Sequence, residues 1–299
     1  MIRGLDLLRI FALLLITWQH AASALGFYAA TQWRLISPGQ AGVAIFCGVS
    51  GLLAFSSRPA SPWQWFRRRL ARIFPAYWLV TLVAFGLAFA WSAKKISVGL
   101  FVSQMLGVGY FTHGWELINV VSWFVSLIIL CYALAAIAWQ SDFPKTFLGV
   151  VALLAATLCA LRYEVDLSRH LLSFALVALI PLGVSRSLLG LLGLALLAAG
   201  VFVDPQFFYC GLALTLILPV LRWPVAEPAL ISKAGGYAYE YYLVHGIFLA
   251  GAVKLIANPL YAVSVALALS SITAIVVHRL SQPLIVRLGR APEAFNATA

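Results

Sequence analysis

The sequence alternates between long apolar runs and short breaks that are polar or charged. Breaks such as Ser37-Pro38-Gly39, Asp204-Pro205 and Asn258-Pro259 contain the residues that end helices and begin turns. The runs are close to the length of about 20 residues that an α-helix needs to cross a bilayer. The pattern therefore predicts an all-α membrane bundle of about ten transmembrane helices. The apolar runs are 7–27, 39–57, 73–92, 120–140, 146–161, 170–185, 187–203, 206–221, 237–257 and 260–280.

One further apolar stretch, residues 98–111, is too short to cross a bilayer as a helix. We expect it to lie at the membrane interface or to re-enter the membrane. An eleventh span there would also reverse the orientation of every later loop. It would place most of the basic residues that follow Trp123 outside, against the rule that basic loops face the cytoplasm.

The composition supports a membrane protein. Hydrophobic residue types make up 63% of the 299 residues, charged types only 10%, and the mean hydropathy is +0.99. A soluble domain has about 25% charged residues, so most of this surface must face lipid. No polar stretch is long enough for a separate soluble domain. We expect one membrane domain over 1–285, a short cytoplasmic tail over 286–299, and no cleaved signal peptide.

The charge of the chain sets its predicted orientation. The formal net charge is +11, and the basic residues lie at the ends of the apolar runs, which favours a topological role and lipid headgroups over nucleic acid. With ten spans and a cytoplasmic start, 14 of the 20 basic residues face the cytoplasm, and both termini are cytoplasmic. The inside set is Arg3, Arg9, Arg58, Arg67, Arg68, Arg69, Arg72, Lys145, Arg186, Arg222, Lys233, Arg279, Arg287 and Arg290.

The first apolar run contains two polar residues on one face. Arg9 and His20 are eleven positions apart, which places them within about 20° of each other around a helix and about 16 Å apart along it. Asp6 can pair with Arg9 across one turn. A buried ionisable group in a span is costly unless it is paired or wet, which favours a functional role. Alternatively, His20 hydrogen-bonds to another helix and has no chemical role.

The remaining polar residues support weaker hypotheses. The cluster Arg67, Arg68, Arg69 and Arg72 is either a topological stop or also a site for an anionic cosubstrate. Because single histidines, tyrosines and tryptophans are common at membrane interfaces, structural roles compete with functional ones at each of the following positions. His245 lies among four tyrosines that resemble an interfacial belt, and Glu240 can pair with an arginine. His170 and His278 are expected at span ends, and Trp123 in packing or at a cavity wall. His113 and Glu116 are three positions apart, a spacing that also fits metal ligands, but no third ligand is near them in the sequence, so we expect a loop.

The cysteines do not suggest a metal or disulfide framework. Cys47, Cys131, Cys159 and Cys210 each lie in an apolar run, and none has CxxC spacing. We expect them to be small core residues and predict no metal site. The chain has no internal repeat, so an inverted-repeat transporter gains no support.

Six sequence blocks occur in order along the chain. They are RGLDLLRIFALLLITWQH (3–20), GVAIFCGVSGLLAF (42–55, with Ser50), RRRLARIFPAYWL (67–79), SWFVSLIILCYAL (122–134), YAYEYYLVHGIFL (237–249) and RLSQPL (279–284). Together they resemble the acyltransferase-3 family of membrane acyltransferases, whose hallmark is an arginine, ten residues and a histidine, which Arg9 and His20 match. The chain departs from the family in lacking a glutamate in the tryptophan-led block and in having Gln282 where a glutamate is frequent.

The resemblance implies a reaction and roles for several residues. The donor would be cytoplasmic acyl-CoA, most simply acetyl-CoA, with Arg68, Arg69 and Arg72 near its phosphates. His20 would act as general base or carry the acyl group, and Arg9 would orient the donor or stabilise charge. The acceptor would be a hydroxyl of a glycan or another molecule at the membrane, and the location a bacterial inner membrane. The alternative is a transporter or flippase that uses the buried arginine and histidine without covalent chemistry.

Overall fold

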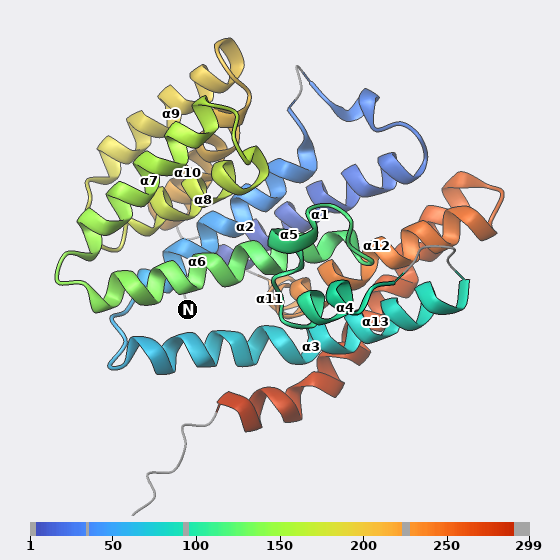
Figure 1. Ribbon diagram of the computed structural model, residues 1–299. Helices are drawn as coiled ribbons and strands as arrows, with labels where there is room; N and C mark the ends of the chain where they lie inside the picture. The colour runs from blue at the N-terminus through green and yellow to red at the C-terminus, as the bar shows by residue number, and fades with distance from the viewer. Residues whose placement is uncertain (1–3, 34–35, 92–95, 223–227, 290–299) are drawn as a thin grey trace, which may run out of the picture.

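The computed structural model describes residues 4–33, 36–91, 96–222 and 228–289, and this part of the chain is helical and contains no β-strand (Figure 1). The predicted all-α fold is therefore confirmed. Five basic residues of the charge count, Arg3, Arg34, Lys94, Lys95 and Arg290, lie outside the described residues, as do positions 290–299 of the expected tail. The helices are α1 (Leu5–Ala24), α2 (Pro38–Phe55), α3 (Pro62–Trp91), α4 (Val98–Met105), α5 (Gly109–His113), α6 (Trp123–Gln140), α7 (Pro144–Ala160), α8 (Val165–Ala178), α9 (Arg186–Phe202), α10 (Gln206–Arg222), α11 (Ala229–Gly236), α12 (Ala238–Leu255) and α13 (Pro259–Gly289), with short 3₁₀ helices η1 (Ala29–Thr31) and η2 (Val120–Ser122).

A helix lies on each of the ten predicted apolar runs: α1, α2, α3, α6 to α10, α12 and α13. Of the described helices, five are long and apolar enough to cross a membrane, namely α1, α2, α3, α13 and the segment 120–140 that contains α6. Three more, α7, α9 and α10, are apolar but shorter. The number of helices on the apolar runs thus matches the prediction, while the ten-span topology remains a prediction.

The stretch 98–111 forms two short helices. The eight residues of α4 rise about 12 Å and the five of α5 about 8 Å, which is far less than the hydrocarbon thickness of a bilayer. This segment therefore cannot cross the membrane as one helix. The chain also remains helical past the expected domain end at 285, because α13 continues to Gly289.

Helix starts follow local sequence. Ser37 caps α2 by accepting a hydrogen bond from the Gln40 backbone, and Pro38 occupies the first turn, where its missing N–H is no loss. Ser97 and Ser185 cap α4 and α9 in the same way. These caps explain why the polar breaks between apolar runs coincide with the ends of helices.

Small residues bring the central helices close together. A Cβ atom on Gly42 would lie 2.4 Å from the Ala12 carbonyl oxygen, so only glycine lets α2 pack this closely on α1. A Cβ atom on Gly51 would lie 2.3 Å from the Phe174 carbonyl oxygen, which fixes α2 against α8. Small residues at helix contacts are typical of membrane bundles, where close packing replaces the hydrophobic effect. Helix α2 is accordingly one of the most buried elements.

The helices form two groups joined by α1, α2 and α6. Helices α7 to α10 pack together on one side, where α2 contacts both α8 and α10, and α3, α12 and α13 pack together on the other (Figure 1). Helix α1 contacts both α2 and α12, so it runs between the groups. This position gives α1 a contact with each of the cavities described below.

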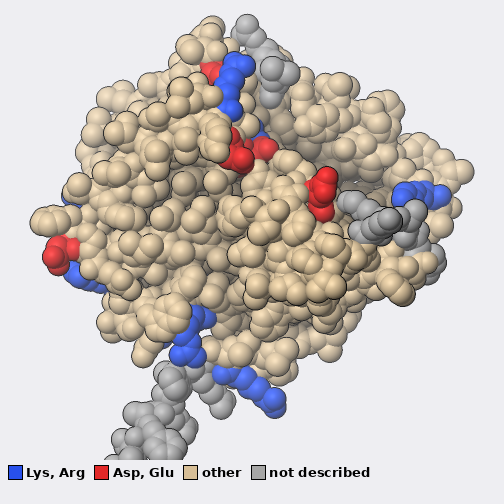
Figure 2. All heavy atoms as spheres, viewed as in Figure 1, with Lys and Arg blue, Asp and Glu red and all other residues tan. Residues whose placement is uncertain are grey.

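The outer surface is apolar. Charged side chains are few and lie apart on the face shown in Figure 2, and large apolar side chains such as Phe89 and Leu255, each 86% exposed, point outward. A soluble monomer rarely exposes so much contiguous apolar surface. The apolar helices and their exposed apolar faces indicate an integral membrane protein.

Candidate functional site

Two cavities of similar size lie near opposite ends of α1. The first has a volume of about 470 Å³ and is lined by Arg9, near the start of the helix. The second has a volume of about 440 Å³ and is lined by His20 and Ser23, near the end of the helix. Tyr242 of α12 lines both cavities, so they approach each other at its side chain. The arginine and the histidine of the hallmark spacing therefore open into two different cavities.

The first cavity gathers residues from seven helices, α1, α2, α3, α6, α11, α12 and α13. Arg9 from α1 and Arg69 and Arg72 from α3, the arginines expected near the donor, all line it, and so does Ser50 from α2. Arg9 also donates to Asp6 at 2.7 Å, which confirms the predicted pair across one helical turn. The rest of the lining is Phe46, Leu53, Ile73, Phe124, Ile128, Tyr132, Gly235, Gly236, Ala238, Tyr239, Glu240, Tyr242, His278, Gln282 and Ile285.

The three residues expected to bind the cosubstrate separate in the structure. Arg69 and Arg72 are three positions apart, share one face of α3 and reach the first cavity. Arg68 is exposed and does not belong to the lining. The guanidinium of Arg69 lies 5.3 Å from the ring centre of Trp65 and 5.6 Å from that of Tyr132, so two aromatic faces hold it in place.

A polar group from α12 and α13 forms another wall of the first cavity. Glu240 pairs with His278 at 2.9 Å between Oε1 and Nδ1, and Gln282 lies 3.1 Å from the other ring nitrogen. The prediction that Glu240 pairs with an arginine was wrong, because the packing of α12 on α13 places His278 next to it. His278, expected at a span end, instead faces this cavity.

Two histidines meet beside the second cavity. Nδ1 of His20 lies 2.6 Å from Nε2 of His245, and Nδ1 of His245 lies 2.7 Å from the backbone carbonyl oxygen of Tyr242. His245 and Tyr242 are buried, so the interpretation of these two residues as part of an interfacial belt was wrong. Sequence reasoning treated the two histidines separately because they are 225 positions apart. Only the packing of α12 on α1 brings them together.

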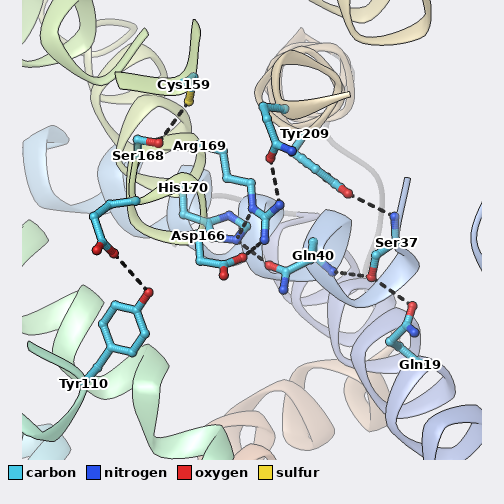
Figure 3. A network of polar contacts seen from close by, with 12 residues as sticks. Gln19, Ser37, Gln40, Tyr110, Cys159, Asp166, Ser168, Arg169, His170 and Tyr209 are labelled. Carbon is cyan, nitrogen blue, oxygen red and sulfur yellow. Dashed lines mark hydrogen bonds and ion pairs between the residues drawn. The ribbon is translucent and has the colours of Figure 1, made fainter. Parts of the chain in front are cut away.

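The second cavity is lined by aromatic rings, amides and hydroxyl groups. Trp123 lines it beside Trp115, with ring centres 5.4 Å apart, so Trp123 both packs and forms a cavity wall. Figure 3 shows a chain of contacts along one side: Ser37 donates its hydroxyl to Gln19 at 2.9 Å and its backbone N–H to Tyr209 at 3.0 Å. This network joins α1, α2 and α10.

A buried ion pair lies next to that network and was missed by the sequence analysis. Arg169 pairs with Asp166 on the first turns of α8 and donates to Gln206 at 2.8 Å, with its guanidinium 5.0 Å from the ring centre of Tyr209 (Figure 3). Asp166 and Arg169 line the second cavity. Their spacing of three positions in a polar helix start is the pattern that would have indicated the pair.

His170 does not lie at an interface, contrary to expectation. It is buried, and its Nε2 atom lies 2.7 Å from the side-chain oxygen of Gln40 (Figure 3). The expected position followed from the run limit of 170–185, whereas α8 begins five residues earlier, at Val165. His170 is thus inside the helix and packs between α8 and α2.

The remaining candidates lie away from both cavities. His113 ends α5 and contacts Ser103 and Thr112, and Glu116 follows in the loop. In the part of the chain that the structure describes, no group of three or more histidine, cysteine, aspartate or glutamate side chains is arranged to hold a metal ion. The four cysteines are buried and free.

Comparison with known proteins gives one match. A family model described as an acyltransferase domain matches residues 2–182. That range includes Arg9, His20, the arginine cluster and the Asp166–Arg169 pair, and it ends before α9. No curated protein and no solved structure matches the chain.

Proposed function

We propose, because this chain belongs to the acyltransferase-3 family, that it moves an acyl group from acyl-CoA in the first cavity to a hydroxyl of an acceptor in the second. The observation that carries this proposal is that Tyr242 lines both cavities, while His20 lines the second and contacts His245, whose ring bonds to the Tyr242 backbone. An acyl transfer needs two substrates within reach of one base, and this arrangement provides that reach.

The donor site is assigned from charge. Three arginines and one glutamate line the first cavity, whereas the charged residues of the second are one aspartate and one arginine. The phosphates of CoA are anionic and form strong, charge-assisted hydrogen bonds with guanidinium groups. We place the phosphates at Arg69 and Arg72 and the thioester near Tyr242. The pantetheine arm then covers the distance of about 16 Å along α1 between Arg9 and His20.

The acceptor site is assigned from its hydrogen-bonding groups. Gln19 is buried in the wall of the second cavity, and its side-chain oxygen accepts from Ser37. Among the described residues, none accepts a hydrogen bond from its amide nitrogen. A buried donor without a partner costs about 1–3 kcal/mol, so an acceptor molecule with an oxygen at this point gains stability from it. A polyhydroxylated molecule such as a glycan supplies such oxygens.

The chemistry needs one base that later acts as an acid. His20 takes the proton of the acceptor hydroxyl, and the oxygen attacks the thioester carbonyl carbon. The carbon–sulfur bond then breaks, and the proton passes from His20 to the departing CoA sulfur. The products are the acyl ester of the acceptor and CoA thiol. Arg9 binds the donor, and its ion pair with Asp6 holds the guanidinium group in a fixed orientation.

The orientation follows from the positive-inside pattern. We propose that the first cavity opens to the cytoplasm, where acyl-CoA is made, and the second to the opposite face, with both termini cytoplasmic. Reporter fusions after Ala299 and near Asp204 test this orientation. An external carboxyl terminus would contradict it.

Thioester consumption tests the proposed reaction. Purified protein in lipid nanodiscs receives acetyl-CoA and a panel of candidate acceptors, and free CoA is measured with a thiol reagent while mass spectrometry follows the acceptor. We expect CoA release that depends on the acceptor, and an acceptor mass increased by one acyl group. Acceptor movement across a vesicle membrane without CoA release would instead indicate a transporter.

A further inference from the structure

We propose that His245 is a positioning residue that holds His20 in the tautomer with its proton on Nδ1 and its lone pair on Nε2. The proposal rests on the proposed function, in which His20 is the base, and it adds a residue of α12, outside the range matched by the family model. His245 itself lines neither cavity, so it acts only through His20.

The geometry of the two rings supports a true hydrogen bond. The ring planes are nearly parallel, at 14°, and the ring centres are 4.9 Å apart. The two nitrogens are only 2.6 Å apart, so they point toward each other along the line that joins the rings. The contact is therefore edge to edge, which is the direction in which an imidazole N–H donates and an imidazole lone pair accepts.

The backbone determines which nitrogen holds each proton. The carbonyl oxygen of Tyr242 can only accept, so Nδ1 of His245, at 2.7 Å, must be the donor. In a neutral imidazole the other nitrogen is then an acceptor, so Nε2 of His245 has a lone pair. Nδ1 of His20 must donate to it. The opposite assignment would place two lone pairs against each other between His245 and Tyr242.

Neutral rings are the stable state of this pair. His245 is fully buried, and its ring lies nearly parallel to that of Tyr241, at 8° and 5.9 Å between centres. Among the described residues, no carboxylate forms an ion pair with His20 or His245. A buried imidazolium without a counter-ion is costly, so each ring holds a single proton in the resting state.

The outcome is a base with a fixed direction. Nδ1 of His20 is occupied by His245, and none of the described residues hydrogen-bonds to Nε2. His20 lines the second cavity, so Nε2 is the only ring nitrogen left to take a proton from a hydroxyl there. Without a partner, a neutral histidine exchanges between two tautomers, and only one of them is a base at Nε2.

Two substitutions of His245 separate this role from simple packing. Asparagine places its side-chain nitrogen near the position of Nδ1, so His245→Asn can still donate to the Tyr242 carbonyl but has no acceptor near His20. Glutamine reaches the position of Nε2, so His245→Gln can still accept from His20. We expect kcat to fall by about 10- to 100-fold in His245→Asn, with the KM values of both substrates nearly unchanged, and to recover to within about fivefold of the unaltered protein in His245→Gln.

Nitrogen NMR of histidine-labelled protein in nanodiscs reads the tautomer directly. His20→Ala identifies the signals of residue 20. We expect a protonated Nδ1 and an unprotonated Nε2 at His20 in the unaltered protein and in His245→Gln, and a mixture of tautomers in His245→Asn. A protonated Nε2 at His20 in the unaltered protein would overturn the proposal, as would equal kcat values for the two variants. Failure of CoA release with the expected tautomer would instead overturn the proposed function and leave the pairing in place.

Discussion

The two cavities at the ends of α1 are nearly equal in volume, about 470 and 440 Å³, but differ in charge. Three arginines and one glutamate line the first, and Arg9 is paired with Asp6, so three positive charges face two negative ones and an excess of one positive charge remains. In the second, the one arginine is neutralised by the aspartate beside it. Size alone would not tell which cavity takes which substrate. Under the proposed function, the charge difference is the reason to place the polyanionic donor in the first cavity and a neutral, hydrogen-bonding acceptor in the second.

The largest effect is expected where the two cavities approach each other. Replacing His20 with alanine should lower the rate of CoA release by about 10²–10⁴-fold, because the acceptor hydroxyl then lacks its base. The change removes no charge partner, so the protein should insert and fold. His113→Ala, at the end of α5 and away from both cavities, is the matched control and should keep normal turnover. Near-normal turnover in well-expressed His20→Ala would show that His20 is not the base.

An accumulated acyl-enzyme would change the interpretation of the same experiment. If the acyl group is carried by His20, rapid quenching with labelled acetyl-CoA and no acceptor should leave label on the protein. A base that acts directly on the acceptor leaves none.

The charge contrast predicts an intermediate effect that is confined to the donor. Arg69→Ala or Arg72→Ala should each raise the KM for acyl-CoA by about 10- to 150-fold, the equivalent of losing about 1.5–3 kcal/mol from a charge-assisted contact. Arg68→Ala is the matched control, because Arg68 is exposed on the same helix outside the lining. An equal rise in the KM for acyl-CoA in all three variants, or no rise in any of them, would indicate that the arginine cluster has only a topological role.

The smallest effect is expected in the neutral cavity. Gln19→Met keeps the length of the side chain but removes the amide nitrogen, together with the oxygen that accepts from Ser37. It should raise the acceptor KM by about 2- to 13-fold, the equivalent of about 0.5–1.5 kcal/mol. The KM for acyl-CoA should stay the same. Gln64→Met, on an exposed position of α3, controls for the substitution itself. A rise in the KM for acyl-CoA in Gln19→Met would contradict the assignment of the second cavity to the acceptor alone.

The fold could be predicted from the sequence because it depends mostly on local pattern. Apolar runs and the Ser-Pro breaks between them are local features, and a described helix lies on every predicted run. The limits of α8 were less predictable, because its first turn contains Asp166 and Arg169, which interrupt the apolar pattern. That shift of five residues moved His170 from an expected interface into the core.

The site was only partly predictable, for a geometric reason. Arg9, Asp6 and His20 share one helix, so their relation follows from helical periodicity. The contacts of His245 with His20, and of Glu240 with His278, depend on how α12 packs against α1 and α13. No local pattern in a single sequence encodes that packing. The arginine cluster correctly indicated that α3 lines the cavity. Which of its arginines reach the cavity depends on the rotation of α3, which turns Arg69 and Arg72 toward it and Arg68 away.

The shared wall at Tyr242 has a consequence for membrane permeability. Its hydroxyl donates to the Val121 carbonyl oxygen at 2.8 Å, and its ring lies edge-on to Phe124, with 5.3 Å between centres. In the orientation that we propose, the two cavities open to opposite faces of the membrane, and this aromatic side chain is then part of the electrical insulation between two aqueous compartments. Most of the membrane voltage then falls across a short distance here, and moving one unit charge through it involves about 2.3 kcal/mol per 100 mV. An enzyme of this design must pass an acyl group between compartments while it remains closed to ions.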